Sequence, residues 1–195
     1  MAARETFVTS GPRIKVRFFG GPDLAGRPAN PRALVDEGYR NGVPIGGTIN
    51  KAAKPPTFTV WASKDPDGAN LDRIQIIKGW VDAQGEPQDK AIDVAWSGAR
   101  KPGPDGKLPP VGNTVDPTKA TYANTIGSAE LVGTWTDPEF DPAKPALYYV
   151  RVLEIPTPRW TTYDAARNNL ALLPDVPATV QERAWTSPIW HTPKL

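Results

Sequence analysis

The sequence predicts a mainly β protein, an antiparallel β-sandwich of the immunoglobulin-like or a related kind, with one or two short helices and long loops. Three observations predict this class. Several segments alternate apolar and polar residues with a period of two, as strands with one buried face do. Turn-forming residues, 23 Pro and 17 Gly in 195 residues, separate these segments. Seven Trp, five Tyr and five Phe supply apolar bulk for a core.

About seven strands are expected where this alternation holds. They are residues 13–18, 57–61, 73–77, 91–96, 130–135, 147–153 and 182–190. Residues 82–86, which include Asp82 and Gly85, lie between two of these strands and predict a hairpin loop. Both faces of 147–153 are apolar, which predicts a central strand covered on both sides.

The alternation also predicts which side chains form the core, because successive side chains of a strand point to opposite faces. In the clearest strand, Ile14, Val16 and Phe18 point one way and three cations point the other. The expected core residues are Ile14, Val16, Phe18, Val60, Ile74, Ile76, Val94, Trp96, Trp135, Val150 and Val152.

Helix is expected in only two places. Asn30 followed by Pro31 is typical of an N-cap with proline at the first helical position, and Gly42 is typical of a stop, so a helix is predicted over 31–41. A second, short helical turn is predicted at 163–169. Residues 97–121 are rich in Pro, Gly and Lys and show no periodicity, which predicts a loop longer than the roughly 12–15 residues usual for a structureless connection.

Charge and composition exclude several classes of partner and site. The formal charge is +2, from 23 Lys and Arg against 21 Asp and Glu. The basic residues are dispersed among acids, whereas nucleic-acid-binding domains cluster them, so no nucleic-acid partner is expected. No apolar segment approaches the roughly 20 residues that span a bilayer, so no membrane partner is expected. The chain has no cysteine, which excludes disulfides, thiolate metal sites and cysteine nucleophiles.

No catalytic or metal-ligating residue is expected, and the chain is not expected to be an enzyme by itself. His191 is the only histidine, whereas zinc sites usually take several His or Cys ligands. The favoured interpretation is a histidine at the surface or partly packed. Ser187 stands four residues earlier on the same face of a strand pattern, so a hydrolase that uses Ser187 and His191 is the weakest alternative.

One acidic cluster resembles part of a calcium loop. Asp65, Asp67, Asn70 and Asp72 are oxygen ligands at nearly alternating spacing around a glycine. The twelfth position of such a loop is Ile76, where the motif requires a bidentate Glu. Because Asp-Pro and Asp-Gly are ordinary turn formers, a structural turn is favoured and calcium is the weaker alternative.

The candidate binding residues are Arg159, Trp160, Tyr163 and Asp164. They combine a guanidinium, two aromatic rings and a carboxylate directly after a strong strand, and Arg and aromatic residues anchor many interfaces. Two prolines just before them predict a rigid, extended loop that meets a substrate or a partner domain. In the alternative, the loop is purely structural and Trp160 fills the core.

Specific sequence runs extend over most of the chain. They are residues 4–14, 64–73, 78–80, 148–160 and 184–190. These runs resemble a bacterial family called domain-of-unknown-function 3604, in which a segment of the form R-E-T-[FY]-x-T-S-G-x-R-I leaves the last helix of the catalytic domain. Full-length members look like metal-dependent hydrolases of the polymerase-and-histidinol-phosphatase type, with metal ligands in an N-terminal barrel that carries a His-x-His motif.

The resemblance implies that residues 1–12 are the remainder of a junction with an upstream domain and that residues 13–195 are a single β-sandwich domain. It implies a non-catalytic C-terminal segment that packs on the missing catalytic barrel and can complete its rim, with no cofactor in this chain and the metal ion in the barrel. It also implies a soluble bacterial protein, periplasmic or secreted. The alternative is a stand-alone module that binds a glycan or a protein. A large exposed apolar face would favour the first hypothesis, and an open aromatic cleft would favour the second.

Overall fold

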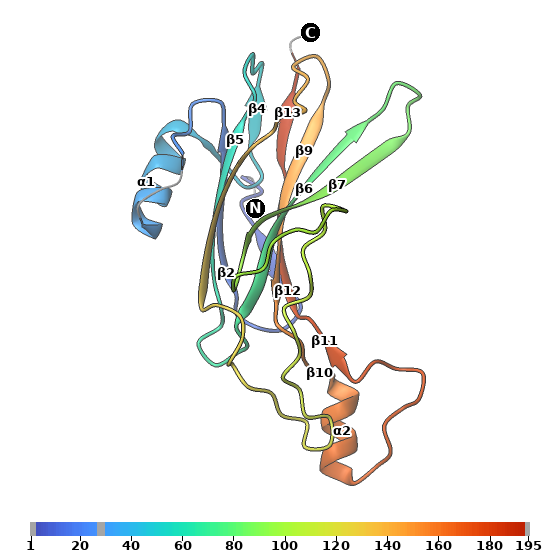
Figure 1. Cartoon of the computed structure of the whole chain (residues 1–195). Helices are drawn as coiled ribbons and strands as arrows, with labels where there is room; N and C mark the ends of the chain where they lie inside the picture. Colours follow the sequence, from blue (N-terminus) through green and yellow to red (C-terminus); the bar gives the residue numbers. More distant parts are fainter. Residues whose placement is uncertain (1–2, 27–29, 194–195) are drawn as a thin grey trace.

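Two β-sheets pack face to face across one hydrophobic core in the computed structural model, which describes residues 3–26 and 30–193 (Figure 1). The smaller sheet consists, in order, of β3 (Val43–Pro44), β2 (Lys15–Gly21), β5 (Thr57–Ser63) and β8 (Glu130–Thr136). The larger sheet consists of β1 (Phe7–Thr9), β4 (Thr48–Asn50), β6 (Leu71–Val81), β7 (Pro87–Trp96), β9 (Ala146–Glu154), β12 (Arg183–Thr186) and β13 (Ile189–Thr192). The predicted mainly β class with packed antiparallel sheets is confirmed.

Strand β9 is the centre of the larger sheet. It pairs with β6 on one side and with β12 and then β13 on the other. Among the described strands only β4 and β13 pair in parallel. The predicted hairpin loop at 82–86 joins β6 to β7, and the side chain of Asp82 accepts hydrogen bonds from the backbone N–H groups of Gln84 and Glu86 at 2.9 Å each. Because β9 has strands on both of its edges, the central position predicted for 147–153 is confirmed, whereas the prediction that both of its faces are covered is wrong, since its outward side chains are only half-buried.

The inner faces of the two sheets form the core that the alternation predicts. Eight of the expected core residues are at most 1% exposed, namely Ile14, Val16, Phe18, Val60, Ile74, Ile76, Val150 and Val152. Val94 and Trp135 are half-buried and pack against this core. The Trp135 ring stacks on that of Phe58, with centroids 6.0 Å apart.

Trp96 does not lie in the core, and the prediction for this side chain is wrong. Strand β7 has one residue more than β6 at a shift in their register, because Asp93 and Ala95 lie opposite consecutive residues of β6. Val94 is therefore the extra residue of a β-bulge. One extra residue turns all the following side chains to the other face, so that Ala95 points inward and Trp96 outward. On the outside, the Trp96 indole donates a hydrogen bond to the carbonyl of Arg100 at 2.8 Å.

Helix α1 (Pro31–Asn41) has the predicted bounds. The side chain of its N-cap Asn30 accepts a hydrogen bond from the backbone N–H of Ala33 at 2.9 Å. Its buried Leu34 packs beside Phe19 on the outer side of the smaller sheet. Capping and one apolar contact thus explain why this segment is helical.

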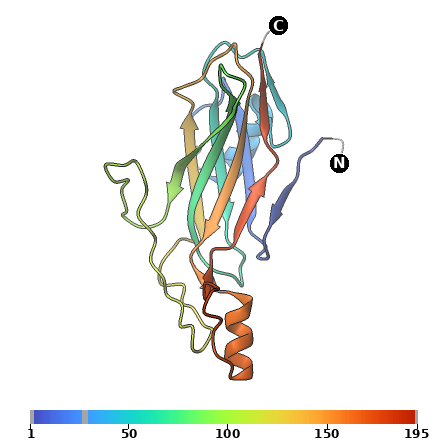
Figure 2. The same cartoon turned by 90° about the vertical axis from the view of Figure 1, so that its right-hand side faces the viewer.

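A second helical unit projects from one end of the sandwich (Figures 1 and 2). It contains α2 (Trp160–Asn168) and a two-stranded sheet of β10 (Thr157–Pro158) and β11 (Thr179–Val180). We call residues 157–180 the α2 unit. The helix begins three residues before the predicted turn at 163–169.

Five short strands, β1, β3, β4, β10 and β11, are not predicted from the sequence. Each has only two or three residues, too few for alternation to mark a strand. Strand β1 pairs antiparallel with β12, so this part of the segment 1–12 lies at the edge of the larger sheet. The origin of that segment as a domain junction stays a prediction.

The long connection from β7 to β8, residues 97–129, includes the loop predicted at 97–121. It consists of turns and extended stretches with an isolated bridge between Asp116 and Thr121. It runs from the outside of the larger sheet to the α2 unit and back (Figure 1). In the part of the chain that the structure describes, no helix is long and apolar enough to span a membrane.

Candidate functional site

The outer face of the larger sheet, which points away from the smaller sheet, carries aromatic and cationic side chains. On β9, Tyr149, Arg151 and Leu153 alternate with the fully buried residues and therefore point outward. On β12, Trp185 lies opposite Arg151, and the Arg183 guanidinium is 5.9 Å from the centroid of the Trp185 ring. These five half-buried residues are the outer patch. Figure 2 turns this face toward the viewer, and in the part of the chain that the structure describes no helix or second sheet lies in front of it.

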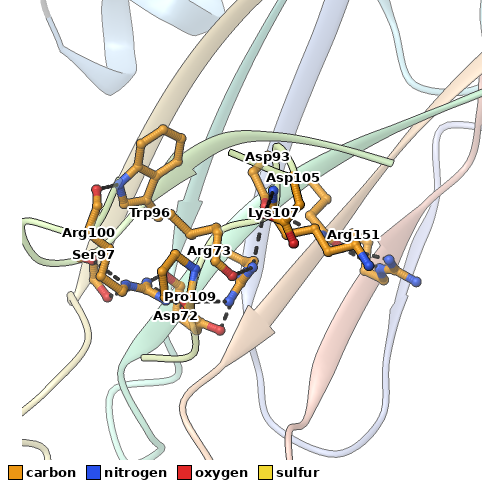
Figure 3. A network of polar contacts seen from close by, with 12 residues as sticks. Asp72, Arg73, Asp93, Trp96, Ser97, Arg100, Asp105, Lys107, Pro109 and Arg151 are labelled. Atoms are coloured by element: carbon orange, nitrogen blue, oxygen red, sulfur yellow. Dashed lines mark hydrogen bonds and ion pairs between the residues drawn. The ribbon is translucent and has the colours of Figure 1, made fainter. Parts of the chain in front are cut away.

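Asp72 is the centre of a buried polar network at the margin of this face (Figure 3). Its side chain is 2% exposed, and its two oxygens lie 2.6 Å from Nη2 of Arg100 and 3.1 Å from Nε of Arg73. Gln181 donates a further hydrogen bond to the carboxylate at 3.0 Å. Both arginines also donate to the carbonyl of Pro109, at 3.3 Å from Arg73 and 2.9 Å from Arg100. The network therefore ties the long β7–β8 connection to the sheet.

The network continues across β7, β6 and β9 to the outer patch (Figure 3). Arg73 Nη1 lies 3.3 Å from a carboxylate oxygen of Asp93. Gln75 donates to the other oxygen of Asp93 at 2.9 Å and accepts two hydrogen bonds from Arg151, at 2.9 and 2.7 Å. A pocket of about 580 Å³ opens beside this chain of contacts, and its walls include Lys90, Ile92, Trp96, Lys107 and Leu108. Asp72 and Asp93 are paired with arginines and Arg151 is held by the Gln75 amide, so the network orients Arg151 and the connection.

The four predicted binding residues lie at the start of α2 instead of in an extended loop, so the prediction of their conformation is wrong. Arg159 is the N-cap, and Trp160, Tyr163 and Asp164 are helical. The two prolines precede the N-cap, where a fixed φ angle does not prevent helix formation. Trp160 is 72% exposed, so it does not fill the core. The Tyr163 ring lies under the guanidinium of Arg167, 5.6 Å from its centroid.

The α2 unit exposes further apolar side chains. Leu170, Leu172 and Leu173, which follow the helix, are 61%, 43% and 54% exposed. Arg159 has a buried Nε atom without a hydrogen-bond partner among the described residues. These residues and Trp160 form a second candidate contact surface at the end of the sandwich.

The residues of the calcium alternative do not converge on one point. The Asp65 carboxylate accepts hydrogen bonds from the backbone N–H, Nε and Nη2 of Arg13 at 2.8, 3.1 and 3.0 Å, and these bonds hold its pKa well below the usual range. Asp67 pairs with the same guanidinium at 2.6 Å. The side-chain amide of Asn70 donates to two backbone carbonyls, and Asp72 belongs to the network above. Within residues 3–26 and 30–193, no three His, Cys, Asp or Glu side chains are grouped to hold a metal ion.

Ser187 and His191 contact different partners. The hydroxyl of Ser187 lies 3.0 Å from that of Thr6. His191 is 2% exposed, its ring packs against Phe140 with centroids 4.8 Å apart, and Nε2 lies 3.4 Å from the carbonyl oxygen of Pro142. The expectation of a surface or partly packed histidine is wrong because β13 turns this side chain inward.

The comparison with known families extends the resemblance found in the sequence. A family model described as "Protein of unknown function (DUF3604)" matches residues 1–193. The chain belongs to the DUF3604 family. Neither a curated protein nor a solved structure matches it significantly. The hydrolase parentage that the resemblance implies stays a proposal.

This DUF3604 chain also has a buried ion pair that is not predicted from the sequence. Lys78 Nζ lies 2.6 Å from Oδ2 of Asp137, and the Tyr148 hydroxyl donates to the same oxygen at 2.7 Å. Lys78 is 7% exposed and the other two residues are fully buried. Burial and the hydrogen bond to Asp137 raise the pKa of Tyr148. The alternation in β6 is a signal for the burial of Lys78. Ile74 and Ile76 point inward, and Lys78 is the next residue on the same face.

A second buried acid of this DUF3604 chain, Glu154, lies at the end of β9. It is 2% exposed, and its Oε1 atom has no hydrogen-bond partner among the described residues. Burial raises the pKa of Glu154 to about 8, with a further contribution from the charges of Glu182 and Asp65. Burial thus disfavours the charged form of this side chain.

Proposed function

We propose that this DUF3604 chain is the non-catalytic β-sandwich part of a metal-dependent hydrolase of the polymerase-and-histidinol-phosphatase type, and that it packs on the catalytic barrel. The outer patch is the observation that carries the proposal. A sheet face in contact with water is usually polar, yet Tyr149, Leu153 and Trp185 lie on a face that no second layer covers in the described residues (Figure 2). Trp, Tyr and Arg are the residues that most often anchor protein interfaces.

The outer patch is ordered before any partner binds. Arg151 is fixed by its two hydrogen bonds to Gln75. Arg183 is fixed by a hydrogen bond to the carbonyl of Gln181 at 3.2 Å and by the Trp185 ring below it. Side chains that are already immobile lose little entropy on association, which favours tight packing of another domain.

The α2 unit extends beyond the edge of the same face (Figure 2). A domain seated on the outer patch would meet this unit at the side, where Trp160 is 72% exposed. Arg159 and Trp160 would then complete the rim of the catalytic barrel. This placement explains why a projecting helix carries an aromatic ring that the sandwich core does not use.

The chemistry would belong to the barrel, which would hold the metal ion. In this chain the single histidine, His191, is buried against Phe140. Asp65, Asp72 and Asp137 are paired with Arg or Lys nitrogens at distances of 2.6 to 3.1 Å. Because these groups stabilise the fold, they support a structural and docking role for the domain.

The test is the affinity of this chain for the catalytic barrel of a DUF3604 protein, with both prepared as separate polypeptides. We expect a complex by isothermal titration calorimetry. Trp185→Ala and Tyr149→Ala should each weaken it by about 30-fold, the effect of removing one interface hot spot.

The matched control is Trp61→Ala, which removes a half-buried tryptophan from the outer face of the smaller sheet. This variant should bind the barrel with unchanged affinity. Absence of a complex, or a complex that both outer-patch variants form as tightly as the unmodified chain, would contradict the proposal.

A further inference from the structure

A groove lies beside the β6–β7 hairpin, which Figure 1 shows at the end of the larger sheet opposite the α2 unit. It has a volume of about 180 Å³, and its walls include Lys78, Trp80, Glu139, Phe140, Asp141 and Lys144. We call it the hairpin groove.

The floor of the hairpin groove is held in place by the buried ion pair. The Lys78 ammonium binds Asp137 at 2.6 Å and the carbonyl of Glu139 at 2.9 Å, and it lies 5.6 Å from the centroid of the Trp80 ring. The backbone N–H of Glu139 donates to the Asp137 carboxylate at 3.0 Å. These contacts fix both the Trp80 ring and the loop that forms the opposite wall, so the groove is formed before a ligand enters.

The rim of the hairpin groove has equal numbers of positive and negative groups. Glu139 pairs with Lys90 at 2.7 Å, and Asp141 pairs with Lys144 at 3.4 Å. All four side chains are between 44% and 58% exposed and can be reached from solvent. An anion or a cation would have to break one of these pairs. A neutral ligand with many hydroxyl groups can instead donate to the carboxylates and accept from the ammonium groups.

Carbohydrates combine such hydroxyl groups with an apolar C–H face. The aromatic wall made by Trp80 offers a flat apolar surface beside the polar rim, the combination that recurs in sites for small ligands. We propose that the hairpin groove binds a carbohydrate chain of neutral sugar units, with the Trp80 ring as the stacking platform. This site is separate from the outer patch and does not depend on the proposed docking.

The experiment is a titration of the full chain with neutral oligosaccharides of glucose, mannose, galactose or xylose, followed by amide NMR shifts. We expect at least one of them to bind with a dissociation constant in the millimolar range or tighter, with shifts at residues 78–80 and 139–146. Trp80→Ala should weaken this binding at least about tenfold through lost stacking. Asp141→Asn changes a half-exposed rim residue without touching the core and should weaken it about threefold or more.

Trp61→Ala is the matched control, because it removes a half-buried tryptophan from the outer face of the smaller sheet and should leave the sugar affinity unchanged. Three results would overturn the proposal. They are no binding of any neutral oligosaccharide at millimolar concentration, binding of uronic-acid oligomers alone, or binding that neither Trp80→Ala nor Asp141→Asn weakens.

Discussion

The two faces of the larger sheet are built by the same strands but carry different kinds of side chain. On β9 the inward Tyr148, Val150 and Val152 are fully buried, whereas the outward Tyr149 and Arg151 are half-buried. Packing inside this chain accounts for the inner face, because a sandwich requires apolar residues at every second position. It does not account for the aromatic and cationic outer patch. The inner face is therefore explained by the fold, whereas the outer face is explained only by the docking proposed above.

Removing Lys78 from the inner face should have the largest effect on stability. Lys78→Met leaves the fully buried Asp137 carboxylate without its cation, which should lower the free energy of unfolding by about 3–5 kcal/mol. Urea denaturation measures the loss. Lys90→Met breaks the exposed pair with Glu139 and should cost less than about 1 kcal/mol. Equal losses in the two variants would show that burial does not distinguish these ion pairs.

Truncating an apolar residue of the inner face should have the next largest effect. Ile76→Ala removes a fully buried side chain and leaves a cavity between the sheets, so the free energy of unfolding should fall by about 2–5 kcal/mol. The same denaturation experiment measures it. A loss below about 0.5 kcal/mol would mean that the inner face is not a packed core.

Most of the inner face could be predicted from the sequence, and the exceptions have physical causes. Alternation identifies eight fully buried residues because the strands are long enough for the pattern to repeat. It places Trp96 on the wrong face because Val94, Ala95 and Trp96 are all apolar, so the sequence does not reveal the bulge at Val94. It does not predict that Lys78 is buried, because a lysine is normally solvated. Its partner Asp137 lies in the connection between β8 and β9, 59 residues further along the chain.

The candidate site was harder to predict, because its residues come from distant segments. Asp72 suggested a calcium ligand, whereas its partners Arg100 and Gln181 lie 28 and 109 residues away in the chain. Arg151 and Trp185 are neighbours only through the pairing of β9 with β12. The role of the Arg159 and Trp160 segment in binding stays a prediction, and the helix that carries it shows no clear start signal in the sequence, since no side chain caps it.

Glu154 offers a test of the inner face that depends on pH. Its pKa is raised from 4.5 to about 8 by burial, so the unfolded chain releases this proton above pH 4.5 while the folded chain keeps it up to about pH 8. The free energy of unfolding should therefore fall as pH rises through this window. In Glu154→Gln that contribution is absent, so the variant should match the unmodified chain near pH 4 and exceed it in stability near pH 8.

Urea denaturation at several pH values measures both proteins. The gain of Glu154→Gln over the unmodified chain should grow between pH 4.5 and about pH 8, because only the unmodified chain carries the shifted carboxyl group. A stability difference that is the same at pH 4 and pH 8 would show that Glu154 ionises normally in the folded chain.

The smallest effect on stability should come from the outer patch. Trp185 is half-buried, and its contacts are with the strand surface and the Arg183 guanidinium at 5.9 Å, a partly exposed cation–π pair of modest strength. Trp185→Ala should therefore lower the free energy of unfolding by about 1 kcal/mol or less, well below the cost of truncating a buried tryptophan, about 3–5 kcal/mol. The same substitution should weaken barrel binding by about 30-fold, as proposed above. The comparison of the two faces therefore predicts that Trp185→Ala changes the free energy of unfolding little and the affinity for the barrel strongly. If Trp185→Ala instead destabilises the isolated chain as much as Ile76→Ala does, then the outer face is a second core surface, and its aromatic residues serve the fold.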